Sequence, residues 1–394
     1  MKAKEIVCPD CGPLPANHLM KYIESLVVFC LPRFNFARFL GAEKLFEKFF
    51  MMLGLVKKDE ILPPEKVSLR TIVFIEEAKK NQAVVKVLKT AFAHLNIFYL
   101  HWRGKTFSFE GLPRAEFLHS KKSYLIDDKA AVKRILLKNN IPTPAGRAFS
   151  LFSKTKALQY ALKLGFPLVV KPCSGSMSHH VTVDIQNLED LKKAIVIALR
   201  YEPFFIVERY LANTKVFRAT VVDKNKIACV ERVPAHVTGD GEHNIQELID
   251  IKNTDSRRGQ AKAKDTTLYK LVFNQTSEAL LKQQNLSLTS VPLLEQRVYL
   301  QNKVILDLGA DLFEVTPNIH PDNLALFRKV AEIFNVYLVG IDFLASDISQ
   351  SWITQDSGII ELNSLPYIDM HHYPTIGEPQ NVAAYLWEMV EKYY

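Results

Sequence analysis

Two short apolar strands near the C-terminus constrain this sequence more than any other feature. The first contains Gly340-Ile341-Asp342-Phe343, and after a short hydrophilic stretch the second runs Ile359-Ile360-Glu361-Leu362-Asn363. Because side chains alternate between the faces of a strand, Glu361 and Asn363 share one side, and Asp342 on a neighbouring strand can face them. Three converging oxygen donors suit Mg²⁺, which proteins usually hold with carboxylates together with substrate phosphates. The alternative is a pair of strands whose polar residues face solvent.

The composition indicates a folded chain without a membrane span. With 394 residues, 48% of them hydrophobic, the sequence is long enough for two or three domains with buried cores. No apolar stretch reaches the roughly 18 residues that a span needs, and the N-terminus lacks the regions of a signal peptide. We therefore expect a soluble, cytoplasmic protein. Charged residues interrupt the apolar segment 22–55, which favours amphipathic helices packed on a domain or partner, with contact to a membrane surface as the alternative.

The cysteines indicate a reducing compartment rather than a disulfide framework, because they are odd in number and scattered. The five are Cys8, Cys11, Cys30, Cys173 and Cys229. Cys8 and Cys11 form a CxxC pair with only His18 nearby. A structural zinc site takes four ligands, so we favour a reduced terminus over a zinc site.

The formal net charge of +8 does not by itself indicate a nucleic-acid partner. The 50 Lys and Arg residues are dispersed among 42 Asp and Glu residues. A nucleic-acid binder usually gathers its basic residues in a patch or a recognised module, and the sequence contains no recognition helix, zinc finger or aromatic stacking motif. We assign the excess charge to binding of anionic small molecules and expect no nucleic acid as a partner.

Turn signals and changes of hydrophobic period divide the chain into four units. The units are residues 1–65, 66–126, 127–211 and 212–394. The first is predicted to be helical and irregular, and the second to be a small α/β leader domain. In that leader, residues 71–75 are predicted as a strand, and the stretch that follows them up to His94 as a helix. Strand and helix patterns then alternate, and the last unit contains the two strands described above.

A second feature is a strand that delivers Lys171 and is followed by a loop of small residues. The loop residues are Ser174, Gly175, Ser176 and Ser178. Their amides and hydroxyls can approach an anion closely, and Lys171 adds a positive charge. The P-loop sequence GxxxxGK[ST] does not occur, so phosphates would be held in another way. A surface hairpin is the alternative reading of the same residues.

The order of these parts resembles the ATP-grasp superfamily. From about residue 70 to the C-terminus, the sequence is similar to the ATP-grasp part of cyanophycin synthetases and of fused glutathione-synthesising ligases. The phrases that carry the resemblance are Asp128-Lys129, Val170-Lys171-Pro172, Val207-Glu208-Arg209, residues 231–241, residues 255–259, residues 320–323 and residues 370–374. The Mur-ligase-like half of cyanophycin synthetases is expected to be absent.

The resemblance implies an α+β ATP-grasp fold. Two α+β lobes would clamp ATP, preceded by the small α/β leader domain and the helical N-terminal segment. The implied activity is an ADP-forming carboxylate-amine ligase that acts on an amino acid or short peptide through an acylphosphate, with ATP and Mg²⁺ as cofactors. A pseudoenzyme or scaffold that binds ATP and Mg²⁺ is the alternative. Whether the chain forms a homo-oligomer stays open.

The resemblance also assigns nucleotide-binding residues. Lys129 and Lys171 match the two lysines that meet ATP phosphates, together with the loop of Ser174, Gly175, Ser176 and Ser178. Lys133 is the alternative to Lys129. Glu208 matches the acid beside adenine, with backbone groups of Val207 and Tyr210 next to it.

The same resemblance assigns residues to the metal and to the reacting groups. Asp342, Glu361 and Asn363 match the magnesium ligands. Arg218 and Arg232 match arginines that would bind an acylphosphate or a substrate carboxylate, and structural salt bridges explain the two arginines equally well.

The sequence departs from its relatives in the phosphate loop, where Ser178, His179 and His180 replace part of a glycine-rich stretch, and at two further positions. Lys215 stands where relatives carry an acid that accepts ribose hydroxyls, and Gln301 stands where they carry an arginine. These changes indicate either a different substrate or weakened catalysis. His371 and His372 are expected to be structural, and Cys173 is expected to be a small loop residue rather than a nucleophile.

Overall fold

The computed structural model of the protein describes most of the chain beyond residue 66. The described residues are 22–23, 51–53, 56–59, 67–90, 94–114, 125–174, 180–261 and 263–394. The predictions for the Cys8/Cys11 pair, for most of residues 1–65, and for Gly175, Ser176 and Ser178 lie outside these ranges. None of the helices in the described ranges has the length and apolar character that a bilayer span requires.

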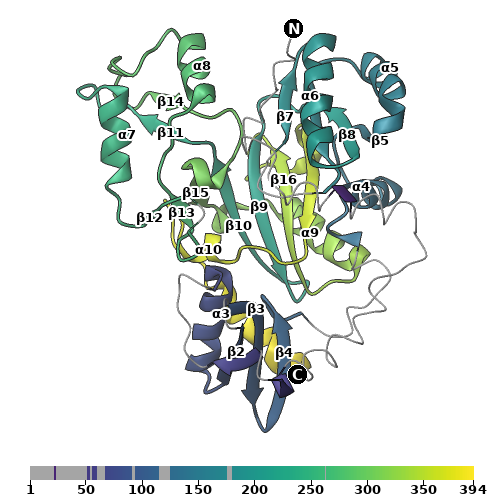
Figure 1. Cartoon of the computed structure of the whole chain (residues 1–394), viewed down its shortest axis with the longest axis vertical. Helices are drawn as coiled ribbons and strands as arrows, with labels where there is room; N and C mark the ends of the chain where they lie inside the picture. The colour runs from purple at the N-terminus through teal and green to yellow at the C-terminus, as the bar shows by residue number, and fades with distance from the viewer. Residues whose placement is uncertain are drawn as a thin grey trace.

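A four-stranded antiparallel sheet in the order β1-β2-β3-β4 lies next to two helices from opposite ends of the chain (Figure 1). The elements are β1 (Val56–Asp59), α3 (Leu69–Lys80), β2 (Val84–Thr90), β3 (His94–Trp102), β4 (Lys105–Glu110) and α11 (Val382–Tyr393). Phe74 on α3, Phe98 on β3 and Trp387 on α11 share one core with this sheet. The C-terminal helix therefore completes a unit that begins near the N-terminus.

This unit corrects the prediction for residues 71–75. The five residues are all buried, and they lie in helix α3 rather than in a strand. Helix α3 packs against both α11 and β2, so nearly every turn of it faces apolar neighbours. A short, continuously apolar run does not distinguish a helix enclosed in this way from a strand. The helix predicted after these residues is present but ends at Lys80 rather than near His94, because β2 occupies Val84–Thr90.

A second four-stranded sheet has the order β5-β8-β6-β7. Its elements and neighbouring helices are α4 (Lys129–Lys138), β5 (Gly146–Ser150), α5 (Lys154–Leu164), β6 (Leu168–Pro172), β7 (Thr182–Ile185), α6 (Leu188–Tyr201) and β8 (Phe204–Arg209). Helices α5 and α6 share a buried core with the sheet. Asp128 caps α4 by accepting from the N–H groups of Ala130 and Ala131, which fixes Lys129 as the first residue of that helix.

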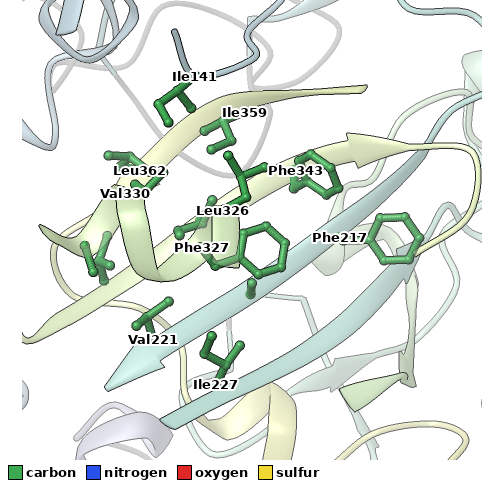
Figure 2. Close-up of a cluster of buried hydrophobic side chains, with 14 of the residues drawn as sticks. Ile141, Phe217, Val221, Ile227, Leu326, Phe327, Val330, Phe343, Ile359 and Leu362 are labelled. Carbon is green, nitrogen blue, oxygen red and sulfur yellow. The ribbon is translucent and has the colours of Figure 1, made fainter. Parts of the chain in front are cut away.

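The central sheet has five strands in the order β15-β10-β9-β16-β17. Its elements are β9 (Lys215–Val222), β10 (Lys226–Val233), β15 (Asp311–Glu314), α9 (Pro321–Phe334), β16 (Leu338–Ala345) and β17 (Ser357–Asn363). Phe217 and Val221 of β9 and Phe343 of β16 pack against Phe327 of α9 (Figure 2). Because side chains alternate along a strand, Arg218 lies on the face of β9 opposite Phe217.

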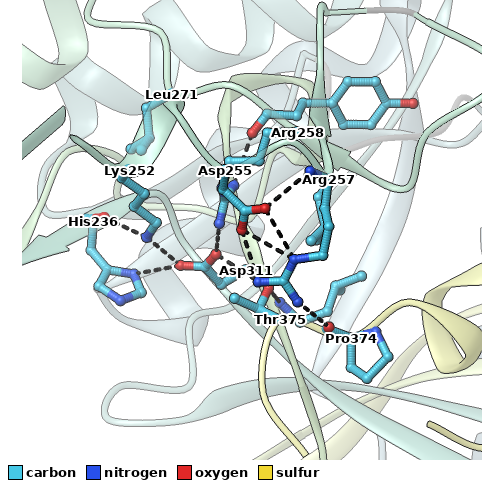
Figure 3. A network of polar contacts seen from close by, with 12 residues as sticks. His236, Lys252, Asp255, Arg257, Arg258, Leu271, Asp311, Pro374 and Thr375 are labelled. Carbon is cyan, nitrogen blue, oxygen red and sulfur yellow. Dashed lines mark hydrogen bonds and ion pairs between the residues drawn. The ribbon is translucent and has the colours of Figure 1, made fainter. Parts of the chain in front are cut away.

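A smaller unit follows β10 and leads back to the central sheet. Its elements are β11 (His236–Thr238), α7 (Ile245–Asn253), β12 (Arg258–Gly259), β13 (Leu268–Tyr269), α8 (Gln275–Gln283) and β14 (Arg297–Tyr299). Figure 3 shows the ion-pair network that connects it to β15. The buried carboxylate of Asp311 contacts Lys252 Nζ at 2.5 Å, His236 Nδ1 at 3.5 Å and the guanidinium of Arg258. Asp311 therefore joins α7, β11 and β12 to the central sheet.

Candidate active site

A cavity of about 550 Å³ lies where the second sheet, the central sheet and the α8–β14 unit meet. One part of its wall is apolar and suits a planar ring. That part comprises Val169, Val181, Val183, Leu211, Val216, Leu344 and Ile360. The wall also carries charged residues, among them Lys129, Lys171, Arg232, Asp342 and Glu361. An apolar wall with a few convergent charged groups is typical of a site for a small molecule.

Glu208, which lines this cavity, contacts two lysines. Its carboxylate contacts Lys171 Nζ at 2.5 Å and Lys133 Nζ at 2.9 Å, and all three side chains are buried. Burial alone would raise the pKa of Glu208, but the two ammonium groups hold this pKa below its ordinary value. The same burial lowers the pKa of Lys133, although Glu208 opposes that change. Glu208 is thus an ionised anchor within a positive cluster.

The structure separates the roles of Lys129 and Lys133. Lys133 Nζ also donates to Pro144 O at 2.5 Å and to Thr143 Oγ1 at 3.1 Å, so its position is fixed by protein groups. Lys129 lines the cavity, and its Nζ lies 3.7 Å from Glu361 Oε2. Of the two candidates for the first phosphate-binding lysine, Lys129 is the one that faces the cavity.

Ser174 lines the cavity, but its donors are engaged by an acid. Its backbone N–H donates to Glu202 Oε1 at 2.5 Å and its hydroxyl donates to Glu202 Oε2 at 2.8 Å. Glu202, a buried residue that follows α6, gave no signal in the sequence. The neighbouring Cys173 has a thiol whose pKa is raised by burial, so it is not a thiolate at neutral pH.

The segment after β8 places Tyr210 and Leu211 at the cavity, whereas Val207 is buried within the strand. The N–H of Tyr210 donates to Pro167 O at 3.0 Å. In the part of the chain that the structure describes, the N–H of Leu211 finds no acceptor. Leu211 is therefore better placed than Tyr210 to donate a backbone hydrogen bond to a ligand, which the sequence did not indicate.

Asp342 is buried between two arginines from neighbouring strands. Its carboxylate accepts from Arg218 Nε and, at 2.8 Å, from Arg232 Nη2. Burial would raise the pKa of Asp342, but the two guanidinium groups hold this pKa below its ordinary value. Buried Nη1 of Arg218 and buried Nε of Arg232 have no hydrogen-bond partner among the described residues. Two guanidinium groups around one carboxylate leave a net positive charge, which favours an anionic group in the cavity that Arg232 lines.

The three predicted magnesium ligands lie on adjacent strands, as their spacing predicts. Asp342 of β16 is directly opposite Glu361 of β17, and Gly340 is opposite Asn363. Glu361 and Asp342 line the cavity, whereas Asn363 does not, and its buried Nδ2 is uncommitted. Within the described ranges, no three His, Cys, Asp or Glu side chains form a metal cluster. Two carboxylates and an amide nevertheless fit Mg²⁺, because a carboxylate has about four lone-pair positions and Asp342 can serve both arginines and a metal.

Other residues singled out in the sequence also have defined places. Lys215 Nζ lies 3.1 Å from Glu231 Oε2, so an acid from β10 stands beside the lysine at this point of the cavity. His371 is buried and its Nε2 is 2.8 Å from Thr220 Oγ1. His372 Nε2 accepts from the N–H of Ala383. Both histidines lie away from the cavity wall, as a structural role requires.

Comparisons with known proteins agree with this geometry. A RimK-like ATP-grasp domain matches residues 126–247. The chain is 35% identical over 264 residues to cyanophycin synthetase of Trichormus variabilis, covering 67% of this chain and 29% of that protein. It is 30% identical over 277 residues to the glutathione biosynthesis bifunctional protein of Clostridium perfringens, covering 69% and 35%. The crystal structure of a bifunctional glutathione synthetase from Pasteurella multocida matches with a TM-score of 0.63 and 25% identity, over 84% of this chain and 45% of that one.

The fold, the cavity and these matches define a member of the ATP-grasp superfamily, with an α+β fold as predicted. More narrowly, its curated relatives include cyanophycin synthetases and bifunctional glutathione-synthesising proteins. The chain spans about a third of the length of these relatives, from 29% to 36%.

Proposed function

We propose that the chain is an ATP-dependent carboxylate-amine ligase that forms an amide bond on an amino acid or short peptide and releases ADP. The observation that carries the proposal is the single cavity that joins an apolar wall, Lys129 and Lys171 to the cluster of Arg232, Asp342 and Glu361. The apolar wall suits a base, the lysines suit phosphates, and the arginine suits the group that is transferred.

The nucleotide would lie between the second sheet and the central sheet. Val169, Val183 and Leu211 are placed to contact the base, with the N–H of Leu211 as a donor. Lys129 and Lys171 are placed to contact phosphate oxygens, and Glu208 keeps Lys171 in position. Mg²⁺ would be held by Glu361, Asp342 and Asn363. When bound, it neutralises charge on the phosphates as the reaction proceeds.

The reaction follows from the groups that the cavity offers. A carboxylate oxygen of the substrate attacks the γ-phosphorus of ATP, and the bond from that phosphorus to ADP breaks. An amine nitrogen then attacks the acyl carbon, phosphate leaves with the electron pair of the carbon–oxygen bond, and the ammonium proton passes to solvent. The guanidinium of Arg232, a residue that lines the cavity, would attract oxygens of the acylphosphate through its charge. Positioning and charge stabilisation suffice for this chemistry, which needs no protein nucleophile.

A specific observation also favours the second candidate, an ATP-binding pseudoenzyme or scaffold. Ser174 is engaged by Glu202, and both oxygens of Asp342 are engaged by arginines. Glu202 therefore competes with phosphates for Ser174, and the two arginines compete with a metal for Asp342.

ADP release measured alongside nucleotide binding separates the two candidates. A ligase should release ADP and phosphate only when amino acids or short peptides are added, and Glu361→Ala should abolish that release. Glu189→Ala, an exposed position on α6, is the control and should behave as wild type. Magnesium-dependent nucleotide binding without stimulation by any amino acid or dipeptide in a broad set would reject the ligase and leave the scaffold.

A further inference from the structure

A second, smaller cavity of about 370 Å³ lies between the edge strand β5 and helix α5 (Figure 1). Arg147 of β5 is paired with Val207 of β8, so the two side chains point to the same face of the sheet. Val207 belongs to the core that α5 and α6 share with this sheet. Glu208, the next residue along β8, points to the opposite face and lines the candidate active-site cavity. The two cavities therefore lie on opposite faces of the second sheet.

Two cations line the smaller cavity, and no acid of the described chain neutralises them. They are Arg147 of β5 and Lys156 in the first turn of α5, and both side chains are exposed. Neither makes a hydrogen bond or an ion pair with the residues that the structure describes, although the Arg147 guanidinium lies 5.9 Å from the ring centroid of Phe149. None of the described residues in the wall is an acid. This surplus of positive charge favours an anionic ligand.

Tyr160 adds a hydroxyl group to the same wall. It follows Lys156 by four residues on α5, so the two side chains are neighbours on the helix surface. The hydroxyl makes no hydrogen bond within the described ranges. Partial burial raises the pKa of Tyr160, and the positive charge of Arg147 acts in the opposite direction. The hydroxyl is therefore a neutral donor at neutral pH, near enough to Arg147 to sense its charge.

Aromatic rings form the apolar part of this wall. The ring centroids of Phe149 and Tyr160 are 5.5 Å apart, with the ring planes tilted by 52°. Phe204 of β8 also lines the cavity. The hydroxyl of Ser153 is already committed, because it accepts from the N–H of Ser150 at 2.8 Å and donates to the carbonyl of Ser150 at 3.0 Å. A ligand ring would therefore meet aromatic surface, which suits a planar group.

We infer that the smaller cavity binds a small ligand that carries an anionic group on a planar ring. The anionic group would contact Arg147, Lys156 and the hydroxyl of Tyr160, and the ring would pack against Phe149 and Phe204. A volume of about 370 Å³ is near the lower limit for small-molecule sites, which favours a ligand with one ring. This site is separate from the candidate active site and does not depend on the proposed ligase function.

Calorimetric titration of the full chain with phenyl phosphate, with and without Mg²⁺ and ADP, tests this site. We expect saturable binding by the wild type that ADP does not abolish. Arg147→Gln should weaken this binding about tenfold, because it removes a hydrogen bond to a charged group, and should leave ADP affinity unchanged. Lys163→Gln is the matched control, since Lys163 is an exposed residue of α5 outside both cavity walls. Phenol and inorganic phosphate should each bind more weakly than phenyl phosphate.

Three outcomes would overturn the inference. The first is a wild type that does not bind phenyl phosphate, or that binds it no more tightly than Arg147→Gln does. The second is binding that ADP abolishes and Arg147→Gln leaves unchanged, which assigns phenyl phosphate to the candidate active-site cavity. The third is equal affinity for phenyl phosphate and inorganic phosphate, which removes the ring from the ligand class. Tyr160→Phe should also weaken phenyl phosphate, and an unchanged affinity would show that the Tyr160 hydroxyl does not contact the anionic group.

Discussion

Replacing Glu208 by Gln should destabilise the protein strongly, because two buried lysines then share no counter-ion. Glu208 is 3% exposed, and it contacts Lys171 at 2.5 Å and Lys133 at 2.9 Å. Removing one member of a buried ion pair costs about 3–5 kcal/mol. Glutamine keeps one oxygen acceptor, so we expect a loss near the lower limit, about 3 kcal/mol of the free energy of unfolding. Urea unfolding at pH 7 measures it.

Glu189→Gln is the matched control for this prediction. Glu189 pairs with Lys193 on the surface of α6, where the two side chains are 79% and 61% exposed. Exposed ion pairs contribute little, so this variant should unfold at nearly the wild-type urea concentration. If both variants shift the unfolding transition by the same small amount, the buried ion pairs of Glu208 stabilise the fold no more than an exposed pair does.

The pH dependence of the Glu208→Gln effect gives a second check. The folded-state pKa of Glu208 lies below its ordinary value of 4.5, because the ammonium groups of Lys171 and Lys133 outweigh burial. A carboxyl group of this kind stabilises the fold above its unfolded pKa and loses that contribution as pH falls through its folded pKa. The difference between wild type and Glu208→Gln should therefore be constant near neutrality and shrink under acid conditions. A difference that grows as pH falls would contradict this sign.

Three further perturbations test other parts of the structure. Asp311→Asn should lower the free energy of unfolding by about 3 kcal/mol, because Arg258 and Lys252 lose the acid that they share. Asp255→Asn, in the pair with Arg257, should have little effect. Urea unfolding transitions that are similar for the two variants would refute this prediction. Burial lowers the pKa of His236 from 6.5 to about 4. Between pH 6.5 and pH 4 the unfolded chain therefore binds more protons than the folded chain, and the free energy of unfolding should fall as pH drops through this range, by no more than about 3 kcal/mol. His236→Gln should reduce this dependence of the free energy of unfolding on pH. If urea unfolding at several pH values shows the same dependence for the variant and the wild type, other groups cause it. Glu361→Gln should weaken magnesium-dependent nucleotide binding at least tenfold, whereas an unchanged magnesium dependence in equilibrium dialysis removes Glu361 from the metal site.

The sequence was sufficient to predict helices and strands where the local pattern of apolar residues agrees with the burial of the segment. Strands β16 and β17 were predicted because their apolar residues and the hydrophilic stretch between them are both clear. Helix α3 was missed because its run of five buried residues, Thr71 to Ile75, belongs to a helix that packs against α11. That helix comes from the opposite end of the chain, and no local window contains both.

In the candidate site, the residues that line the cavity could be predicted from the sequence, whereas their hydrogen-bond and ion-pair partners could not. One cavity contains five residues that the sequence singled out, and each lies in a helix or strand: Lys129, Lys171, Glu208, Asp342 and Glu361. The partners of these residues could not be predicted. Glu202 lies 28 positions from Ser174, and Arg218 lies 124 positions from Asp342. Such pairings depend on how the sheets meet in three dimensions.

When a nucleotide binds, the hydrogen bonds and ion pairs that these residues already make must be shared or broken. Glu208 already balances Lys171, Glu202 holds Ser174, and Asp342 is shared by Arg218 and Arg232. A triphosphate that contacts Lys171 or Ser174 must share these donors with the carboxylates or displace them, and displacement leaves a buried acid without its partner. Lys129 is different, because it lies 3.7 Å from Glu361, and the 23% exposed side chain of Glu361 can turn toward a metal. Binding of Mg²⁺ by Glu361 would draw this acid away from Lys129 and so strengthen the attraction of Lys129 for the phosphates, so metal and nucleotide should each raise the affinity for the other.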